Sequence, residues 1–186
     1  MKIIIWTLLF FNFSVYAQVP SYKDYSKFKP NLDGNHFYNS EENHYRIKVP
    51  VDWLVQIDQT LGNELTITSK DINASLSINV GTSKTKYDFS AYDAPVQRLF
   101  QEFKNYYPTA EFLKSERTYL ANEKCTLMKV KYTNKTTGEE VIIYVDKYYI
   151  IKDNLTITIT CLVPETFKKK YDDAFIKILS TFAFIL

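Results

Sequence analysis

Apolar and polar residues alternate over most of the chain beyond residue 44. The stretches HYRIKV, ELTITS and ASLSINV each place an apolar residue at every second position, as a strand with one buried face requires. Leu61, Gly62 and Asn63 supply a turn signal between two of these stretches. We therefore expect the three stretches to form an antiparallel meander.

The apolar spacing changes to a helical period after Pro95. The residues that follow this period are Val96, Leu99, Phe100, Phe103 and Tyr106 or Tyr107. Pro95 is tolerated in the first turn of a helix, and Pro108 ends it. The pattern predicts one helix after the first group of strands.

Strand patterns return after Pro108 and then give way to a second helix. Alternating runs occur in EFLKSERTYL, CTLMKVKY, EVIIYVDKYYII and LTITITCLV, and turn residues stand where each run stops, which predicts consecutive hairpins. Cys161 falls on the apolar face of the last run, so we expect it to point to the core. Pro164 opens a helix whose apolar stripe consists of Phe167, Tyr171, Ala174, Ile178 and Phe182.

The order of these elements indicates the fold class. Strands, a helix, further strands and a final helix are typical of an α+β domain, whereas a parallel sheet would alternate strands and helices. We predict an antiparallel β-sheet flanked by helices, an α/β/α sandwich, in a single domain over residues 43–186.

The first 17 residues predict export. MKIIIWTLLFFNFSVYA has a lysine, an apolar run and a small final residue, which is typical of a secretory signal peptide cleaved between Ala17 and Gln18. A retained membrane anchor is the alternative, although the apolar run is short for one. We expect a periplasmic or secreted chain without stable membrane insertion after cleavage.

Residues 18–42 form a predicted amino-terminal extension. No steady period runs through them, and two prolines and a glycine interrupt the segment. The extension carries more aromatic residues than solvated linkers usually do. Our candidate partner-binding residues are Tyr22, Tyr25, Phe28 and Tyr38. These side chains lie either against the domain's own surface or against a partner protein.

Few residues can support catalysis or metal binding. The histidines are His36 and His44, and no serine or cysteine stands in a recognisable nucleophile setting. A metal site would need both histidines and the nearby acids Glu41 and Glu42 to converge, with no spacing typical of zinc or calcium sites. We therefore predict no catalytic residue, no metal site and no cofactor.

Other features leave alternatives open. Cys125 and Cys161 are either two buried thiols or one disulfide. Most of the 15 tyrosines and 13 phenylalanines should fill and fringe the sheet, while the pairs at 106–107 and 148–149 could edge a groove. Without Lys2, 22 basic residues (23 − 1) face 21 acidic ones, and this balance argues against a nucleic-acid partner.

The stretch VPVDW combines a strand break with a large aromatic residue. Pro50 lacks the amide that a strand ladder needs, so we expect the first strand to end at Val49. Trp53 then re-enters at the next strand, where its ring can plug the end of the core. The alternative is that Trp53 stacks on a ligand.

This arrangement resembles the PsbP-like superfamily over about residues 43–184. The individually matching positions are Tyr45, Ile47, Val49, Pro50, Trp53 and Phe182. The superfamily includes the extrinsic photosystem II subunit, which docks through an amino-terminal extension, a Ran-binding nuclear import factor and many exported bacterial proteins. The resemblance implies an antiparallel sheet between helices and mostly non-enzymatic docking onto larger assemblies, but it transfers no functional residue.

These observations predict an exported, non-enzymatic accessory protein that docks onto another protein or a surface assembly. The expected partner is an unidentified protein or a surface glycan. One alternative is a small-ligand or lipid-binding module that holds its ligand between the sheet and a helix. An enzyme is the third possibility, and it would require a histidine to meet a carboxylate or a cysteine in a cleft.

Overall fold

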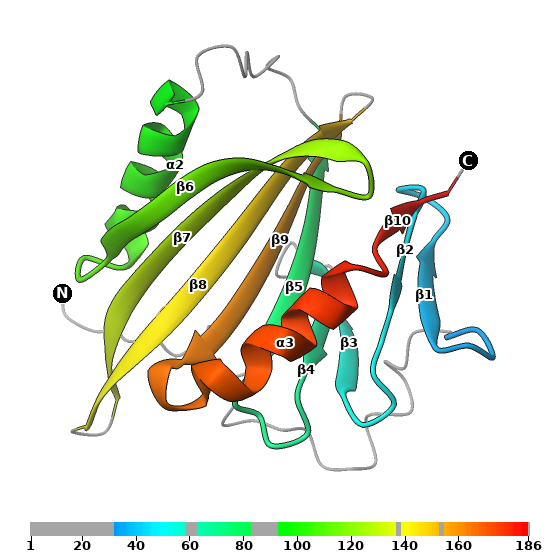
Figure 1. The fold of residues 1–186 in the computed structure, drawn as a ribbon, viewed down its shortest axis with the longest axis horizontal. Helices are drawn as coiled ribbons and strands as arrows, with labels where there is room; N and C mark the ends of the chain where they lie inside the picture. The colour runs from blue at the N-terminus through cyan, green and yellow to red at the C-terminus, as the bar shows by residue number, and fades with distance from the viewer. Residues whose placement is uncertain (1–31, 59–62, 83–92, 137–138, 153–154, 186) are drawn as a thin grey trace, which may run out of the picture.

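The computed structural model describes residues 32–58, 63–82, 93–136, 139–152 and 155–185, which form two antiparallel sheets and two α-helices (Figure 1). The larger sheet has seven strands in the order β3-β4-β5-β9-β8-β7-β6. Their bounds are β3 Leu54–Asp58, β4 Asn63–Thr68, β5 Ser75–Thr82, β6 Glu111–Leu120, β7 Glu123–Thr136, β8 Glu139–Lys152 and β9 Leu155–Pro164. The α+β class and the consecutive hairpins from β6 to β9 are therefore confirmed.

The smaller sheet corrects the predicted meander. Its three strands are β1 (Phe37–Ser40), β2 (Tyr45–Lys48) and β10 (Ala183–Phe184), in the order β1-β2-β10. The stretch HYRIKV thus forms β2, which pairs with β1 and with the carboxyl-terminal strand, while β3, β4 and β5 form the meander without it. Alternation reports which face of a strand is buried, but it does not report which strand lies alongside.

Two helices cover opposite faces of the large sheet. Helix α2 (Asp93–Tyr106) packs over β7 and β8, and α3 (Lys168–Leu179) crosses β9, β5 and β4 (Figure 1). Neighbouring residues of β9 show the two faces: Cys161 belongs to the core under α3, and Leu162 packs against the core under α2. Because successive strand residues point to opposite faces, the helices must lie on opposite sides. The predicted flanking helices are confirmed.

The core under α3 is filled by side chains from both sheets and the helix. The helix contributes Tyr171, Phe175, Ile178 and Leu179, all buried. Phe182 also enters this core, but it lies beyond the end of α3 and not on the helix as predicted. A ligand held between the sheet and α3 would need the space that these side chains occupy, which counts against the small-ligand alternative.

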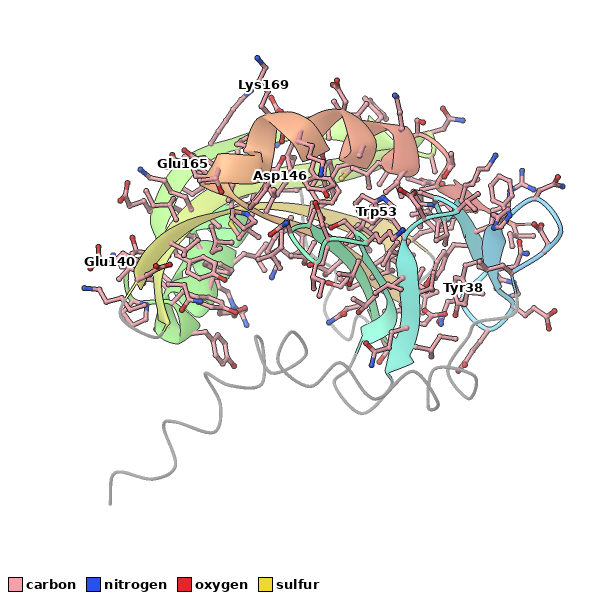
Figure 2. All side chains as sticks on the ribbon, turned by 90° about the horizontal axis from the view of Figure 1, so that it is seen from below. Tyr38, Trp53, Glu140, Asp146, Glu165 and Lys169 are labelled. Carbon is pink, nitrogen blue, oxygen red and sulfur yellow. The ribbon has the colours of Figure 1, made fainter. Side chains whose placement is uncertain are left out.

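Trp53 stands immediately before β3, between that strand and α3 (Figure 2). Its backbone N–H donates to the Pro50 carbonyl over 3.0 Å, which closes the turn after β2. The half-buried indole meets the rings of Tyr171 and Phe175 edge-on, with centroids 5.8 and 6.1 Å away. These contacts confirm that Trp53 plugs the core beneath α3.

The two cysteines are buried thiols on separate strands, so the alternative of a disulfide is excluded. Cys125 on β7 and Cys161 on β9 are separated by β8, which places them about two strand spacings of ~4.8 Å apart before any offset along the strands. Bridged Cα atoms lie within about 7 Å. Burial raises the pKa of Cys125 to about 12 and that of Cys161 well above its ordinary value.

Candidate functional site

The two histidines lie at opposite ends of the β1–β2 hairpin. His36 precedes β1 and its carbonyl accepts the Val49 N–H, while the carbonyl of His44, just before β2, accepts the N–H of Ile185. Both histidines are exposed. Within the described ranges, no three histidine, cysteine, aspartate or glutamate side chains gather as metal ligands would. The two histidines therefore do not come together in one site.

The predicted amino-terminal extension enters the domain earlier than residue 43. Leu32 forms a bridge with Tyr38 and packs against the core, and β1 pairs along its whole length with β2. Tyr38 is only 8% exposed. Its ring therefore packs against the domain itself, which is the first of the two positions foreseen for these side chains, and its role in partner binding stays a prediction. The other three candidates, Tyr22, Tyr25 and Phe28, lie outside the described residues.

A single carboxylate fastens this hairpin to the large sheet. Glu64 on β4 accepts hydrogen bonds from the Tyr38 hydroxyl over 3.3 Å, from the Ser40 hydroxyl, and from the Asn43 amide over 2.9 Å. The Ser40 oxygen in turn accepts the Asn43 backbone N–H. Burial, followed by the charge of Glu64, raises the pKa of Tyr38 to about 12. We call these residues the Glu64 clamp.

Tyr45, the first residue of β2, lies next to the Glu64 clamp. Its side chain is fully buried, and its hydroxyl has no hydrogen-bond partner among the described residues. Burial and the charge of Glu64 raise its pKa far above the ordinary tyrosine value. The ring packs 6.1 Å from that of Tyr38 and 5.4 Å from that of Phe182, so the small sheet is held by both packing and hydrogen bonds.

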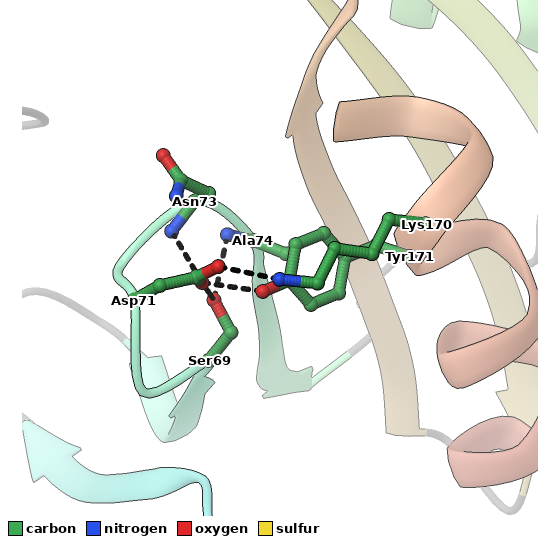
Figure 3. Close-up of polar contacts among 6 residues, drawn as sticks. All are labelled: Ser69, Asp71, Asn73, Ala74, Lys170 and Tyr171. Carbon is green, nitrogen blue, oxygen red and sulfur yellow. Dashed lines mark hydrogen bonds and ion pairs between the residues drawn. The ribbon is translucent and has the colours of Figure 1, made fainter. Parts of the chain in front are cut away.

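A second carboxylate fastens α3 to the loop between β4 and β5 (Figure 3). Asp71 accepts hydrogen bonds from Lys170 Nζ over 2.7 Å and from the Tyr171 hydroxyl. Ser69 Oγ donates to the same carboxylate over 2.7 Å, and the Asn73 N–H donates over 3.3 Å. The Lys170 contact, followed by that of Tyr171, holds the pKa of Asp71 well below its ordinary value. This Asp71 latch is a structural contact.

The outer face of the small sheet is basic and aromatic. Arg46 and Lys48 are exposed residues of β2, and both lie over the ring of Phe37 on β1, with the guanidinium carbon 5.3 Å and the ammonium nitrogen 5.8 Å from its centroid. None of the ion pairs formed within the described residues involves either cation. We call Phe37, Arg46 and Lys48 the outer patch.

The tyrosine pairs do not edge a groove together. Tyr148 and Tyr149 are neighbours on β8 and so point to opposite faces of the sheet. Tyr106 at the end of α2 is 77% exposed, whereas Tyr107 stacks on Tyr132 with centroids 4.3 Å apart. The two tyrosines of each pair therefore have different surroundings.

The sequence did not predict the two carboxylates that fasten the small sheet and α3 to the large sheet. Glu64 and Asp71 meet partners that stand far away in the sequence, and no local pattern signals such contacts. The outer patch did leave a signal, because Arg46 and Lys48 occupy the outward positions of an alternating strand.

The described helices include none with the length and apolar character needed to cross a membrane.

Comparisons with solved structures find the same fold in distant proteins. CyanoP, the cyanobacterial PsbP from Synechocystis sp. PCC 6803, superposes with a TM-score of 0.60 at 11% identity, covering 80% of this chain and 91% of CyanoP. LpqN of Mycobacterium tuberculosis, described as involved in cell envelope biogenesis, gives 0.52 at 14% identity, covering 83% and 95%. The Saccharomyces cerevisiae Ran-binding protein Mog1p gives 0.51 at 11% identity, covering 80% and 94%.

The sequence itself matches no protein-family model, and no curated protein matches it either. The likeness therefore lies in the three-dimensional arrangement and not in sequence motifs. At such low identity it establishes architecture alone. This chain has the Mog1/PsbP-like fold that CyanoP, LpqN and Mog1p share.

Proposed function

We propose that this chain is an exported, non-enzymatic accessory protein that docks onto another protein or a surface assembly through residues 18–31. The proposal rests on the contacts that hold the chain directly after this segment. Leu32 packs into the core, and the Glu64 clamp holds the strand that follows it. Mog1p is described as Ran-binding and LpqN as involved in cell envelope biogenesis, so binding and accessory roles occur on this fold.

A fixed base limits where the aromatic residues of the segment can reach. Phe28 is four residues from Leu32 and Tyr22 is ten residues away, so their backbones lie within about 14 and 36 Å of it even in a fully extended chain. A partner held by Tyr22, Tyr25 or Phe28 must therefore lie within this reach of Leu32. Tyrosine and phenylalanine are enriched in the centres of protein interfaces.

Reactive groups of the described residues serve structural contacts, which supports a role without chemistry. The thiols of Cys125 and Cys161 are buried, and the raised pKa of each keeps it protonated and poorly nucleophilic. The carboxylates of Glu64 and Asp71 are taken up by hydrogen bonds that fasten the small sheet and α3. These groups stabilise the scaffold from which the segment extends.

Deletion of residues 18–31 tests the proposal. The shortened mature chain should keep its melting temperature, because Leu32 and β1 stay in place, and it should no longer recover a partner from the envelope and medium fractions of the native organism. A matched variant of the full mature chain, with Tyr22, Tyr25 and Phe28 changed to serine, should lose the same partner. Equal recovery by the intact and both altered chains would refute docking through this segment.

The deletion must stop at residue 31. Removing residues 18–42 would also remove β1 with Tyr38 and Ser40, two of the donors of the Glu64 clamp, and would uncover Tyr45. Loss of binding by that longer deletion would report unfolding of the small sheet. It therefore serves as the destabilised control, with a lower melting temperature than either of the other chains.

A further inference from the structure

We infer that the face of the large sheet opposite α3 binds an acidic saccharide, with the Lys147 ammonium as the partner of its carboxylate and side-chain hydroxyls as the partners of its hydroxyl groups. Those hydroxyls belong to Thr66 on β4, Ser77 on β5 and Thr158 and Thr160 on β9, which we call the hydroxyl row. The inference goes beyond the proposed function and does not rest on it, because it uses residues of the described strands alone.

The strand register places the hydroxyl row and the lysine side by side. Ser77 pairs with Thr66 on one neighbouring strand and with Thr160 on the other. Thr160 also pairs with Lys147 on β8. Directly paired residues of an antiparallel sheet point to the same face about 5 Å apart, so the four side chains form one line across four strands. Ile159 is buried in the core under α3, which puts its neighbour Thr160 and the whole line on the other face.

Helix α2 covers only one side of this face. The described members of the core beneath it come from α2, the residues directly after α2, β7 and β8, with Leu162 from β9 at its margin, and β4 and β5 lie away from the helix (Figure 1). The four side chains of the hydroxyl row are half-buried, and their hydroxyls form no hydrogen bond with any described residue. A hydroxyl both donates and accepts hydrogen bonds, so this row can serve a ligand.

Lys147 distinguishes this face from an ordinary solvated sheet surface. Its ammonium lies 5.5 Å from the ring centroid of Phe103 and 5.9 Å from that of Tyr149, at the edge of α2. The ion pairs of the described residues do not include it. The acid whose charge reaches it is Glu102, which pairs with Arg98 over 2.9 Å. Burial therefore lowers the pKa of Lys147, and an anion beside it would favour its charged form.

The shape and chemistry of the line favour a saccharide with one acidic group over other anions. From Thr66 to Lys147 the line covers three strand spacings, roughly 14 Å, which is longer than an inorganic ion. Glu64, two positions before Thr66, gives its carboxylate to the Glu64 clamp. An extended peptide would add to the edge of a sheet and not lie across its face. Acidic sugars join a carboxylate to several hydroxyls, as this line requires.

Titration calorimetry on a chain of residues 18–186 tests the inference with three acidic probes: trigalacturonate, a hyaluronan tetrasaccharide and sialyllactose. At least one of them should bind, and the uncharged sugars galactotriose and lactose should bind at least about ten-fold more weakly. Lys147→Met keeps the aliphatic stem and should weaken binding roughly 10- to 150-fold, as the loss of a hydrogen bond to a charged group does. Thr160→Val should weaken it roughly 2- to 12-fold.

A second readout follows the lysine itself. Reductive methylation with carbon-13 keeps the charge of lysine and makes its titration visible by NMR. The pKa of Lys147 should rise when the acidic saccharide binds, because a carboxylate then lies beside the ammonium. A lysine that only packs against rings would keep its pKa. The melting temperature of Lys147→Met should not fall below that of the parent, which excludes unfolding as the cause of lost binding.

The matched control is Lys169→Met on α3, an exposed lysine on the other side of the sheet (Figure 2). It should leave saccharide binding within about two-fold, because solvent and salt screen a distant surface charge. Equal losses in the two lysine variants would show that net charge alone matters and would overturn the inference. Failure of all three acidic probes to bind would also overturn it. Inorganic phosphate that binds as tightly as the saccharide would do the same, since the hydroxyl row would then contribute nothing.

Saccharide binding and docking through residues 18–31 are judged by different measurements. If no acidic saccharide binds but the 18–31 deletion loses its protein partner, the saccharide inference is wrong and the proposed docking stands. If saccharide binding depends on Lys147 while the deletion recovers the partner unchanged, the inference is supported and docking through that segment is refuted.

Discussion

Two tyrosines beside one carboxylate should respond to the same substitution with opposite sign. Tyr38→Phe removes a hydroxyl that donates to Glu64, whereas Tyr45→Phe removes a fully buried hydroxyl without a described partner. A typical hydrogen bond contributes about 0.5–1.5 kcal/mol, and an unsatisfied buried polar group costs about 1–3 kcal/mol. We therefore expect Tyr38→Phe to lower the free energy of unfolding by about 1 kcal/mol and Tyr45→Phe to raise it by about 1–2 kcal/mol.

Thermal and urea unfolding of a chain of residues 18–186, followed by circular dichroism, measure this difference. In a chain of this size 1 kcal/mol shifts the melting temperature by about 2–4 °C, so the two variants should bracket the parent by a clear margin. Both keep the phenyl ring and its contacts, which makes each the control for the other. If Tyr45→Phe destabilises the chain by about 1 kcal/mol or more, its hydroxyl has a bound partner, either the nearby Glu64 carboxylate or a buried water, and the reasoning fails.

The remaining predictions concern the core, the latch and the thiols. Trp53→Ala should lower the unfolding free energy by about 3 kcal/mol, the low end for large aromatic residues because the indole is half-buried, and an unchanged melting temperature would contradict its role as a plug. Asp71→Asn should cost about 1 kcal/mol at neutral pH. Because the folded pKa of Asp71 lies below its ordinary value of 3.8, its stabilisation is present above that pH and is lost as the pH falls further, so the parent should lose more stability on acidification than Asp71→Asn does in matched urea titrations. Cys125 and Cys161 should resist a thiol reagent at about pH 8 until urea unfolds the chain, and rapid labelling of the folded chain would contradict their burial.

The elements of this fold could be predicted because each carries a local period. The alternating runs of β6 to β9 and the helical spacing of α2 depend on residues only a few positions apart, and the structure confirms them. The pairing of β2 could not be found in this way. Its neighbours are β1, which begins in a segment without any period, and β10, which has only two residues.

The contacts that define the candidate site escaped prediction for a related reason. Glu64 stands 26 positions from Tyr38, and Asp71 stands 99 positions from Lys170. A polar residue on a predicted strand does not show which distant donors will surround it. The role of Trp53 could be predicted more easily, because a large aromatic residue three positions after a strand-ending proline can bury its ring at the end of the core.

The contacts of residues 32–40 limit how the predicted extension can work. If the domain began at residue 43, all of 18–42 would be a free tether, and its aromatic residues could reach a partner far from the small sheet. Leu32 and β1 instead hold the chain against β2, with Tyr38 and Ser40 bound to a carboxylate of the large sheet. Residues 32–40 of the predicted extension are thus held within the small sheet and its packing. A deletion that reaches into residues 32–40 would consequently remove donors of the Glu64 clamp, so it could not separate a loss of docking from a loss of the small sheet.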